Sequence, residues 1–272
     1  MKQLPMYIGM LVLAILLAGC TPKNLPAETT APSLPAETTI CTTVPETEAP
    51  TEIPTETPTE APTQPEHSPL YIPGLDVEDV IRYFNEVCLD AEFVNSGNAS
   101  LLQKWGSPIY YTLYGAYTDE DLDTLTGFAQ WLNTIEGFPG MYETDDPTLC
   151  CLSIYFCDSE ELIDRMGDNF VGMDGAVTFW YMDNEIYDAI ICYRTDLNQY
   201  LRNSVILEEI YNGLGPIQDT ALRPDSIIFA EYSEPQALTE IDELILRLLY
   251  HPQMQFGMDA AECEAVIRQL YY

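Results

Sequence analysis

A stretch of low complexity divides this chain of 272 residues and limits what it can fold into. Residues 21–69 hold 11 of the 20 prolines together with many threonines and glutamates, and the sequence LPAETT occurs there twice, at 25–30 and at 34–39. Such a composition buries too little apolar surface to offset the entropy of ordering the chain, so we expect a disordered linker. Residues 70–272 remain for folding, which is enough for one domain with one hydrophobic core.

The first twenty residues have the pattern of an export signal. Lys2 precedes an uncharged, mostly apolar run, Met6–Leu17, which is short for a transmembrane helix and suits the core of a signal peptide. The run ends in Leu-Ala-Gly-Cys, which resembles the bacterial lipobox. The resemblance implies that Cys20 receives diacylglycerol and becomes the new N-terminus after cleavage. An ordinary signal peptide or a short anchor helix is the alternative interpretation.

The signal and the linker together predict where the folded domain lies. In a polyproline-like form, the linker would reach on the order of 150 Å, far enough to cross part of a thick cell wall. We therefore expect a domain held on the extracytoplasmic face of the cell membrane by the lipid on Cys20, in a bacterium of the Gram-positive type.

The charge of the chain excludes some partners and some metal sites. With 44 acidic and 10 basic residues, its net charge of −34 repels nucleic-acid phosphates and anionic membrane surfaces. Its two histidines are His67, in the linker, and His251, so no pair of histidines in the folded domain can bind zinc. A protein or a glycan outside the cell remains as the expected partner.

Hydrophobic periodicity predicts a single α+β domain with a mixed sheet and C-terminal helices. Caps and turn residues set the expected boundaries, and the turn Asp183-Asn184 is expected to join two strands in a hairpin. The expected helices are 77–89, 119–134, 197–212, 240–250 and 260–270, and the expected strands are 109–114, 149–157, 176–182 and 185–193.

The sequence LEEIYNGLG at Leu207–Gly215 carries the most informative spacing. Glu208 and Asn212 are four residues apart on one face of a helix, Glu209 lies beside them, and glycines end the helix. A zincin helix has this layout, with two histidines that bind zinc and a glutamate that activates water. The order of the segments that follow is similar to that of metzincin-type peptidases, in which a helix ending in Leu-Gly precedes a Met-turn and a C-terminal helix.

The residues at the chemically important positions differ from that pattern. Only Glu209, at the position of the general base, is retained and is the candidate catalytic residue. The positions of the three ligands and of the Met-turn methionine are occupied by Glu208, Asn212, Gln218 (followed by Asp219) and Ile228. Because imidazole suits zinc and a carboxylate with an amide does not, we predict no metal ligands and no cofactor, with a harder divalent cation left open.

A version of this motif with two glutamates, Glu-Glu-x-x-Gln or Asn-x-Leu-Gly, is similar to the family called domain of unknown function 2927, whose members are secreted and lipid-anchored bacterial proteins. The stretches YFNEV, KW, LN-x-I-x-GFPG and GLG match it too, so the resemblance covers most of residues 77–272. The resemblance implies a domain that is itself similar to a degenerate metzincin-type zincin. The family name implies no activity.

Three functions remain open. The first is a cell-surface lipoprotein with a non-catalytic, zincin-like binding module. The second is a peptidase-like hydrolase that uses Glu209 with an atypical carboxylate and amide metal site. The third is a structural module stabilised by calcium, suggested by the acidity alone. The acids Asp119, Glu120, Asp121 and Asp123 fail the EF-hand pattern and are expected to form the first turn of a helix.

Acids near the C-terminal end of a helix oppose its macrodipole, so Glu208 and Glu209 are expected to have a partner. Arg202 lies six residues before Glu208, which is the wrong spacing, and Arg194 or Arg223 is the expected alternative. Seven cysteines follow Cys20, an odd number that cannot pair completely within one chain. The disulfide pattern stays open for those in the folded part, which are Cys88, Cys150, Cys151, Cys157, Cys192 and Cys263.

Overall fold

A computed structural model describes residues 68–89 and 101–272, except residue 232. The predicted signal peptide, Cys20 and the linker up to residue 67 lie outside the described residues. Residues 68–272 belong to one compact unit. None of the helices in the described part combines the length and the apolar character needed to cross a lipid bilayer.

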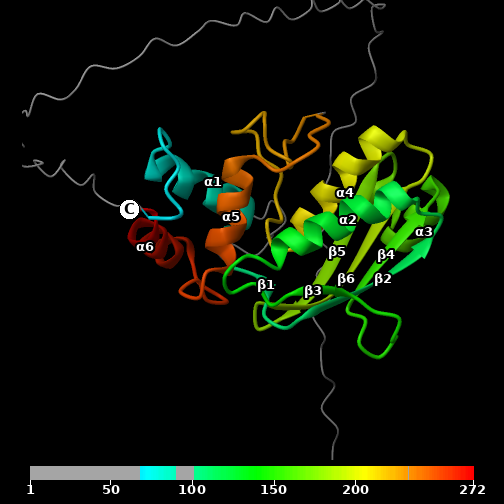
Figure 1. Cartoon of the computed structure of the whole chain (residues 1–272), viewed down its shortest axis with the longest axis horizontal. Coiled ribbons are helices and arrows are strands. Elements are labelled where there is room, and N and C mark those ends of the chain that lie inside the picture. The colour runs from blue at the N-terminus through cyan, green and yellow to red at the C-terminus, as the bar shows by residue number, and fades with distance from the viewer. Residues whose placement is uncertain (1–67, 90–100, 232) are drawn as a thin grey trace, which may run out of the picture. The chain divides into compact units, whose positions relative to one another are not determined.

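Helices alternate with strands through the first two thirds of this unit, and helices complete it (Figure 1). In chain order the elements are α1 (Val77–Leu89), β1 (Lys104–Trp105), β2 (Ile109–Gly115), α2 (Asp119–Leu132), β3 (Met141–Glu143), β4 (Leu152–Cys157), α3 (Ser159–Met166), the short 3₁₀ helix η1 (Asp168–Phe170), β5 (Gly175–Met182), β6 (Glu185–Arg194), α4 (Gln199–Gly213), α5 (Glu240–Tyr250) and α6 (Ala260–Tyr271).

The six strands form one mixed sheet. Its order is β1-β6-β4-β2-β3, with parallel pairing throughout, and β5 is paired antiparallel with β6. The hairpin between β5 and β6 turns at Asp183 and Asn184, whose φ angles are 53° and 67°. Positive φ at both central residues belongs to the type I′ turn, which suits a two-residue hairpin and favours asparagine and aspartate. The predicted mixed sheet and hairpin are confirmed.

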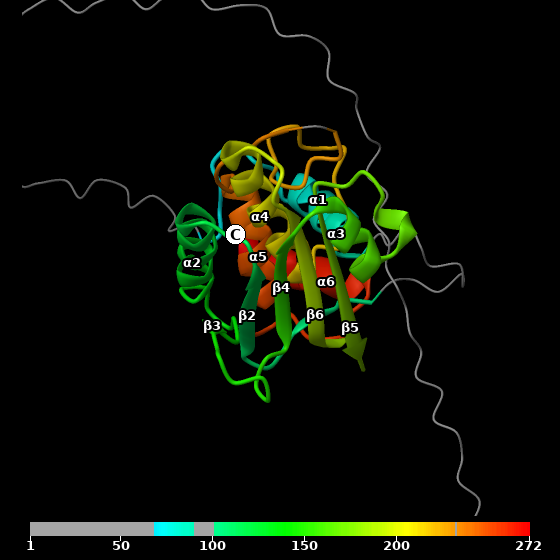
Figure 2. The ribbon, with the colours of Figure 1, turned by 90° about the vertical axis from the view of Figure 1, so that its right-hand side faces the viewer.

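Successive side chains of a strand point to opposite faces of the sheet, and both faces are covered by other hydrophobic side chains. Val177, Ile191 and Tyr193 belong to the main hydrophobic core, to which α2 and α4 contribute. Ala176 and Cys192 have the opposite parity and pack in a smaller cluster with side chains of α3 and η1. Figure 2, in which the strands lie side by side, shows how the helices surround the sheet. α4 packs on β5 and β6.

Helices α1, α5 and α6 complete the main core beside α4. Tyr211 of α4 donates a hydrogen bond of 3.1 Å to the carbonyl of Asp242 in α5, and Tyr250 of α5 donates one of 2.7 Å to the carbonyl of Leu214 after α4. All four residues are buried. These bonds fix the C-terminal end of α4, where the candidate site lies, against α5.

Most element boundaries agree with the sequence prediction. α1 and α5 span the predicted residues. α4 begins at Gln199 rather than at residue 197, because Asn198 caps it by accepting a 3.0 Å hydrogen bond from the amide of Leu201. β4 begins at Leu152 rather than at residue 149, because the amide of Cys150 bonds back to the carbonyl of Asp146 in a turn.

Candidate functional site

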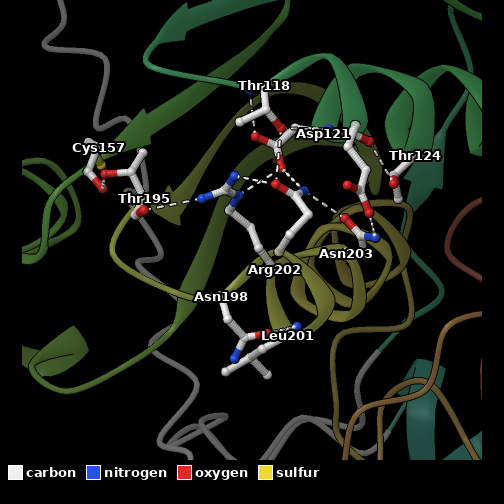
Figure 3. Close-up of polar contacts among 11 residues, drawn as sticks. Thr118, Asp121, Thr124, Cys157, Thr195, Asn198, Leu201, Arg202 and Asn203 are labelled. Atoms are coloured by element: carbon white, nitrogen blue, oxygen red, sulfur yellow. Dashed lines mark hydrogen bonds and ion pairs between the residues drawn. The ribbon is translucent and has the colours of Figure 1, made fainter.

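A buried ion pair holds the N-terminal part of α4 against α2. Nε of Arg202 lies 2.7 Å from Oδ1 of Asp121, and the two side chains are 7% and 0% exposed. Figure 3 shows the pair between the two helices, with Arg202 reaching also to the carbonyl of Thr195, at 3.1 Å. Because α2 and α4 are 81 residues apart at this contact, the pair fixes α4 in the tertiary structure.

Asp121 is also part of the cap of α2. Its Oδ2 accepts a hydrogen bond from the amide of Thr118, and the Thr118 hydroxyl accepts one from the amide of Asp121, which makes a capping box. Gln199 adds a 2.6 Å bond to Oδ1 of Asp121. Burial raises the pKa of Asp121, but the bonds from Arg202 and the other donors outweigh it and hold the pKa below its usual value. Asp119, Glu120 and Asp121 form the first turn of α2 as predicted, whereas Asp123 lies in α2 beyond that turn.

The C-terminal half of α4 carries the residues that the sequence singles out, but the structure brings Glu209, and not the predicted Glu208, to one cavity with Asn212. Glu209 is 4% exposed and Asn212 is 2% exposed, whereas Glu208 is partly buried. Glu209 and Asn212 line a small cavity of about 10 Å³, whose other walls are Phe170, Met173, Gly175, Ala176 and Val177. The site therefore lies between α4 and the start of the edge strand β5.

Glu209 packs closely on the first residue of β5. A β-carbon on Gly175 would stand 2.8 Å from Cγ of Glu209 and 2.9 Å from its Oε1, closer than side-chain carbons approach other atoms. Glycine at residue 175 thus leaves the space that the Glu209 carboxyl occupies. The reach of this side chain to β5 was not predictable from the spacing on α4.

The acids of the site raise one another's pKa. Burial, with the charge of Asp219 beside it, raises the pKa of Glu209 to about 8. Burial, with the charges of Glu209, Asp219 and Asp174, raises the pKa of Glu208 well above its usual value. The charge of Asp219 therefore acts on both glutamates and that of Asp174 on Glu208, and Asp174 was not a predicted site residue.

The expected arginine partners are directed elsewhere. Arg194 forms ion pairs with Asp174 at 3.1 Å and with Asp196 at 2.7 Å. Arg223 pairs with Asp225 at 2.9 Å. Among the described residues no ion pair reaches Glu208 or Glu209, so the predicted pairing with Arg194 or Arg223 is wrong. Their raised pKa values are the consequence, because a nearby cation would lower them.

The segment between α4 and α5 is held in place by a buried hydrogen-bond network. Asp242 accepts bonds from Ser226 at 2.7 Å, from Tyr83 at 3.0 Å and from the amide of Ile227 at 3.1 Å. Ile228, at the Met-turn position, is fully buried in the core. Its carbonyl accepts a 2.8 Å bond from the amide of Thr220. Asp219 is thereby placed directly before a fixed residue.

Gln218, at the third-ligand position, and Asp219 beside it differ in burial and in their effect on the site. Gln218 is partly buried, and its amide donates to the carbonyl of Val87. Asp219 is 7% exposed and contributes charge to the site. In the described ranges no group of three or more His, Cys, Asp or Glu side chains is arranged to hold a metal ion. With a carboxylate and an amide in place of imidazoles, these residues do not fit zinc.

The other candidate residues have structural roles. The described cysteines, Cys88, Cys150, Cys151, Cys157, Cys192 and Cys263, are free thiols. His251 occupies the C-cap position of α5, and its Nδ1 accepts a 3.2 Å bond from the amide of Gln253. Phe170 and Met173 are site residues that sequence reasoning missed, because no motif links η1 and its flank to α4.

The fold and the site define a single α/β domain whose edge strand and last sheet-packed helix enclose a small, mainly apolar pocket with one carboxyl group and one amide. The family described as "Protein of unknown function (DUF2927)" matches residues 77–269, and the chain belongs to this family. The comparison with curated proteins gives no match.

Proposed function

We propose that this protein is a lipid-anchored, extracytoplasmic binding protein whose domain is zincin-like and non-catalytic. Its ligand site is the pocket between α4 and β5. The observation that carries the proposal is a buried Glu209 at the base position, with the charge of Asp219 acting on it and no histidine at the ligand positions of the motif.

The order of elements around the site supports the zincin-like interpretation. α4 carries Glu208, Glu209 and Asn212, and ends at Gly213 beside the sheet. The segment that contains Ile228 follows, packed into the core, and then α5. This is the order of helix, turn and C-terminal helix that the motif resemblance implies.

The electrostatics of Glu209 favour binding over catalysis. A general base must be ionised, but a pKa of about 8 leaves Glu209 mostly protonated at neutral pH. The usual means of activating water in such a site is a metal ion, and the residues present do not fit zinc. A protonated carboxyl and an amide can instead hydrogen-bond a ligand.

The lipobox-like sequence at Cys20 and the linker after it support the extracytoplasmic location. The net charge of −34 supports a partner other than nucleic acid or an anionic membrane surface. A protein or a glycan outside the cell fits both features.

A hydrolysis assay tests the function directly. We expect the full chain to leave casein, a fluorogenic peptide mixture and cell-wall glycan uncleaved, with and without added Zn²⁺, Mn²⁺ or Ca²⁺. The alternative function, a hydrolase based on Glu209, predicts cleavage that Glu209→Gln abolishes and that Glu136→Gln, an exposed acid on the loop after α2, leaves unchanged. That result would overturn the proposal.

A further inference from the structure

Two of the free thiols lie side by side on the sheet. Cys157 is the last residue of β4, and Cys192 belongs to the neighbouring strand β6. In the register of these parallel strands Cys192 stands opposite Tyr155, two residues before Cys157, so both cysteines project from the same face. The two thiols are hydrogen-bonded to each other. Their side chains are therefore in contact, although different strands carry them.

This thiol pair is enclosed at one end of the sheet. Cys157 and Cys192 are 4% and 0% exposed, and they pack in the smaller hydrophobic cluster with side chains of α3 and η1. Directly after Cys157 the chain is exposed, at Asp158 and through the first residues of α3. The pair is therefore nearest to solvent at Cys157, and a reagent that reaches it must be small.

The surroundings favour the thiolate form of Cys157. Cys192 donates the hydrogen bond between the thiols, which lowers the pKa of Cys157 and outweighs the opposite effect of burial. The positive charge of Arg165 acts in the same direction as this bond. The guanidinium carbon of Arg165 lies 3.7 Å from the centre of the Tyr155 ring, and Tyr155 stands opposite Cys192. Cys157 also directly precedes Asp158, the N-cap of α3, and a helix N-terminus favours a thiolate.

Cys192 has the opposite property. Its hydrogen bond to Cys157 and its burial raise the pKa of its thiol, so it keeps its proton while Cys157 ionises. The thiolate is the form of cysteine that attacks an oxidant, and a thiol beside it can resolve the oxidised product. The two cysteines thus divide the roles that a redox site requires.

We propose that Cys157 and Cys192 form a redox site at which hydrogen peroxide produces a reversible disulfide between β4 and β6. The Cys157 thiolate attacks one oxygen of the peroxide, the O–O bond breaks, and Cys157 becomes a sulfenic acid. The hydroxide that leaves takes up the proton that Cys157 had released and becomes water. The sulfur of Cys192 then displaces the sulfenic oxygen, which leaves as a second water with the proton of Cys192.

This reaction is balanced and needs no further reactant. Two thiols are oxidised to one disulfide, and one peroxide is reduced to two molecules of water. Peroxide suits the site because it is small enough for a thiol that is only 4% exposed. The inference goes beyond the proposed binding function and does not depend on it.

The register indicates that the disulfide is easily reduced. Diagonal neighbours on adjacent strands have Cα atoms about 7–8 Å apart, whereas a disulfide without strain spans less than about 7 Å. Closing the bond must therefore draw the end of β4 towards β6. A strained disulfide is more reducible than an unstrained one, so the modification is reversible rather than a permanent cross-link.

Mass spectrometry of the oxidised protein tests the pairing. The reduced full chain is treated with hydrogen peroxide while folded, its remaining thiols are alkylated in denaturant, and the chain is digested. We expect a disulfide-linked pair of peptides that contain Cys157 and Cys192, and a loss of these two thiols from the alkylated fraction. Dithiothreitol should restore both thiols.

Two variants separate the roles of the cysteines. Cys192→Ser keeps a hydrogen-bond donor but has no resolving thiol, so Cys157 should stop at the sulfenic acid and be labelled by dimedone. Cys157→Ser should show neither dimedone label nor disulfide at Cys192. Cys150→Ser changes a partly buried thiol before β4 and is the matched control, which should form the disulfide as the parent chain does. Circular dichroism verifies that each variant is folded, and the result for the parent chain requires no variant.

Three results would overturn the inference. These are the absence of a disulfide after oxidation of the folded parent chain, a disulfide that joins other cysteines such as Cys88 and Cys263, and dimedone labelling of Cys192→Ser that spares Cys157. Each would leave the proposed binding function intact, because the hydrolysis assay tests that function separately.

Discussion

Two buried acids in this domain have opposite properties, and the partner of each explains the difference. Asp121 and Glu209 are 0% and 4% exposed. Arg202 contacts Asp121 and outweighs the effect of burial on its pKa, whereas among the described residues no cation pairs with Glu209, whose pKa rises to about 8. An acid such as Asp121, buried with a cation partner, stabilises the fold at neutral pH. A buried acid without such a partner, such as Glu209, indicates a functional site.

The unpartnered acid predicts an unusual dependence of stability on pH. The pKa of Glu209 is higher in the folded chain than in the unfolded chain, so the folded state binds more protons between the two values. The contribution of Glu209 to the free energy of unfolding is fully present below a pH of about 4.5, falls as pH rises, and is lost above a pH of about 8. Glu209→Gln removes this dependence. We expect the variant to be more stable than the parent chain at about pH 9, by at most a few kcal/mol, since one pKa unit corresponds to about 1.4 kcal/mol.

Urea unfolding of both chains at several pH values measures this effect. The control is Glu136→Gln, which removes an exposed acid far from α4 in sequence. Parallel stability curves for the parent chain and Glu209→Gln between about pH 5 and pH 9 would show that Glu209 ionises normally and would remove the electrostatic argument for the site.

At the scale of elements, the contact between α2 and α4 determines where the site residues lie. Arg202 and Asp121 are both buried, so removing one charge leaves the other without compensation. We expect Arg202→Leu to lower the free energy of unfolding by about 3–5 kcal/mol. Arg82→Leu, which breaks an exposed pair with Asp79, should cost no more than about 1 kcal/mol. Chemical denaturation at neutral pH compares them, and equal losses would contradict a role for burial.

The long elements of this fold follow from local sequence, and the short ones do not. α1 has apolar residues at helical spacing and an aspartate that accepts a bond from the amide of Glu78, and the β5–β6 hairpin has both alternation and a turn signal. β1 and β3 have only two and three residues, too few to show a period. α3 has one short apolar stripe, Leu162 and Met166, in eight residues.

The site was half predictable for the same reason. Glu208, Glu209 and Asn212 share one helix, so their spacing alone predicts that they act together. The cavity holds only Glu209 and Asn212 of these three, and its walls include Phe170 and Met173, whose distance along the chain hides the contact. A sequence pattern can identify functional residues that lie on one helix. It cannot identify the residues that a different element contributes to the same cavity.

At the scale of the whole molecule, the chain joins a domain with uncompensated acids to a predicted lipid anchor. All described arginines are paired, so the remaining acids leave the domain strongly negative. Electrostatic attraction to an anionic membrane is thereby excluded as a means of attachment. Attachment to the membrane must then rest on a covalent lipid or on an apolar N-terminal helix.

Cys20 is the residue that the proposed attachment requires. We expect the full chain, produced in a bacterium, to incorporate a labelled fatty acid and to sediment with membranes. Cys20→Ala should lose the label and the lipid-dependent attachment, because the diacylglycerol has no other acceptor in the lipobox-like sequence. Cys41→Ala, which changes a cysteine of the linker, is the matched control and should behave like the parent chain. Label absent from the parent chain would show that the N-terminal segment acts as an ordinary signal peptide or as an anchor helix. Label retained in Cys20→Ala would show that another residue accepts the lipid.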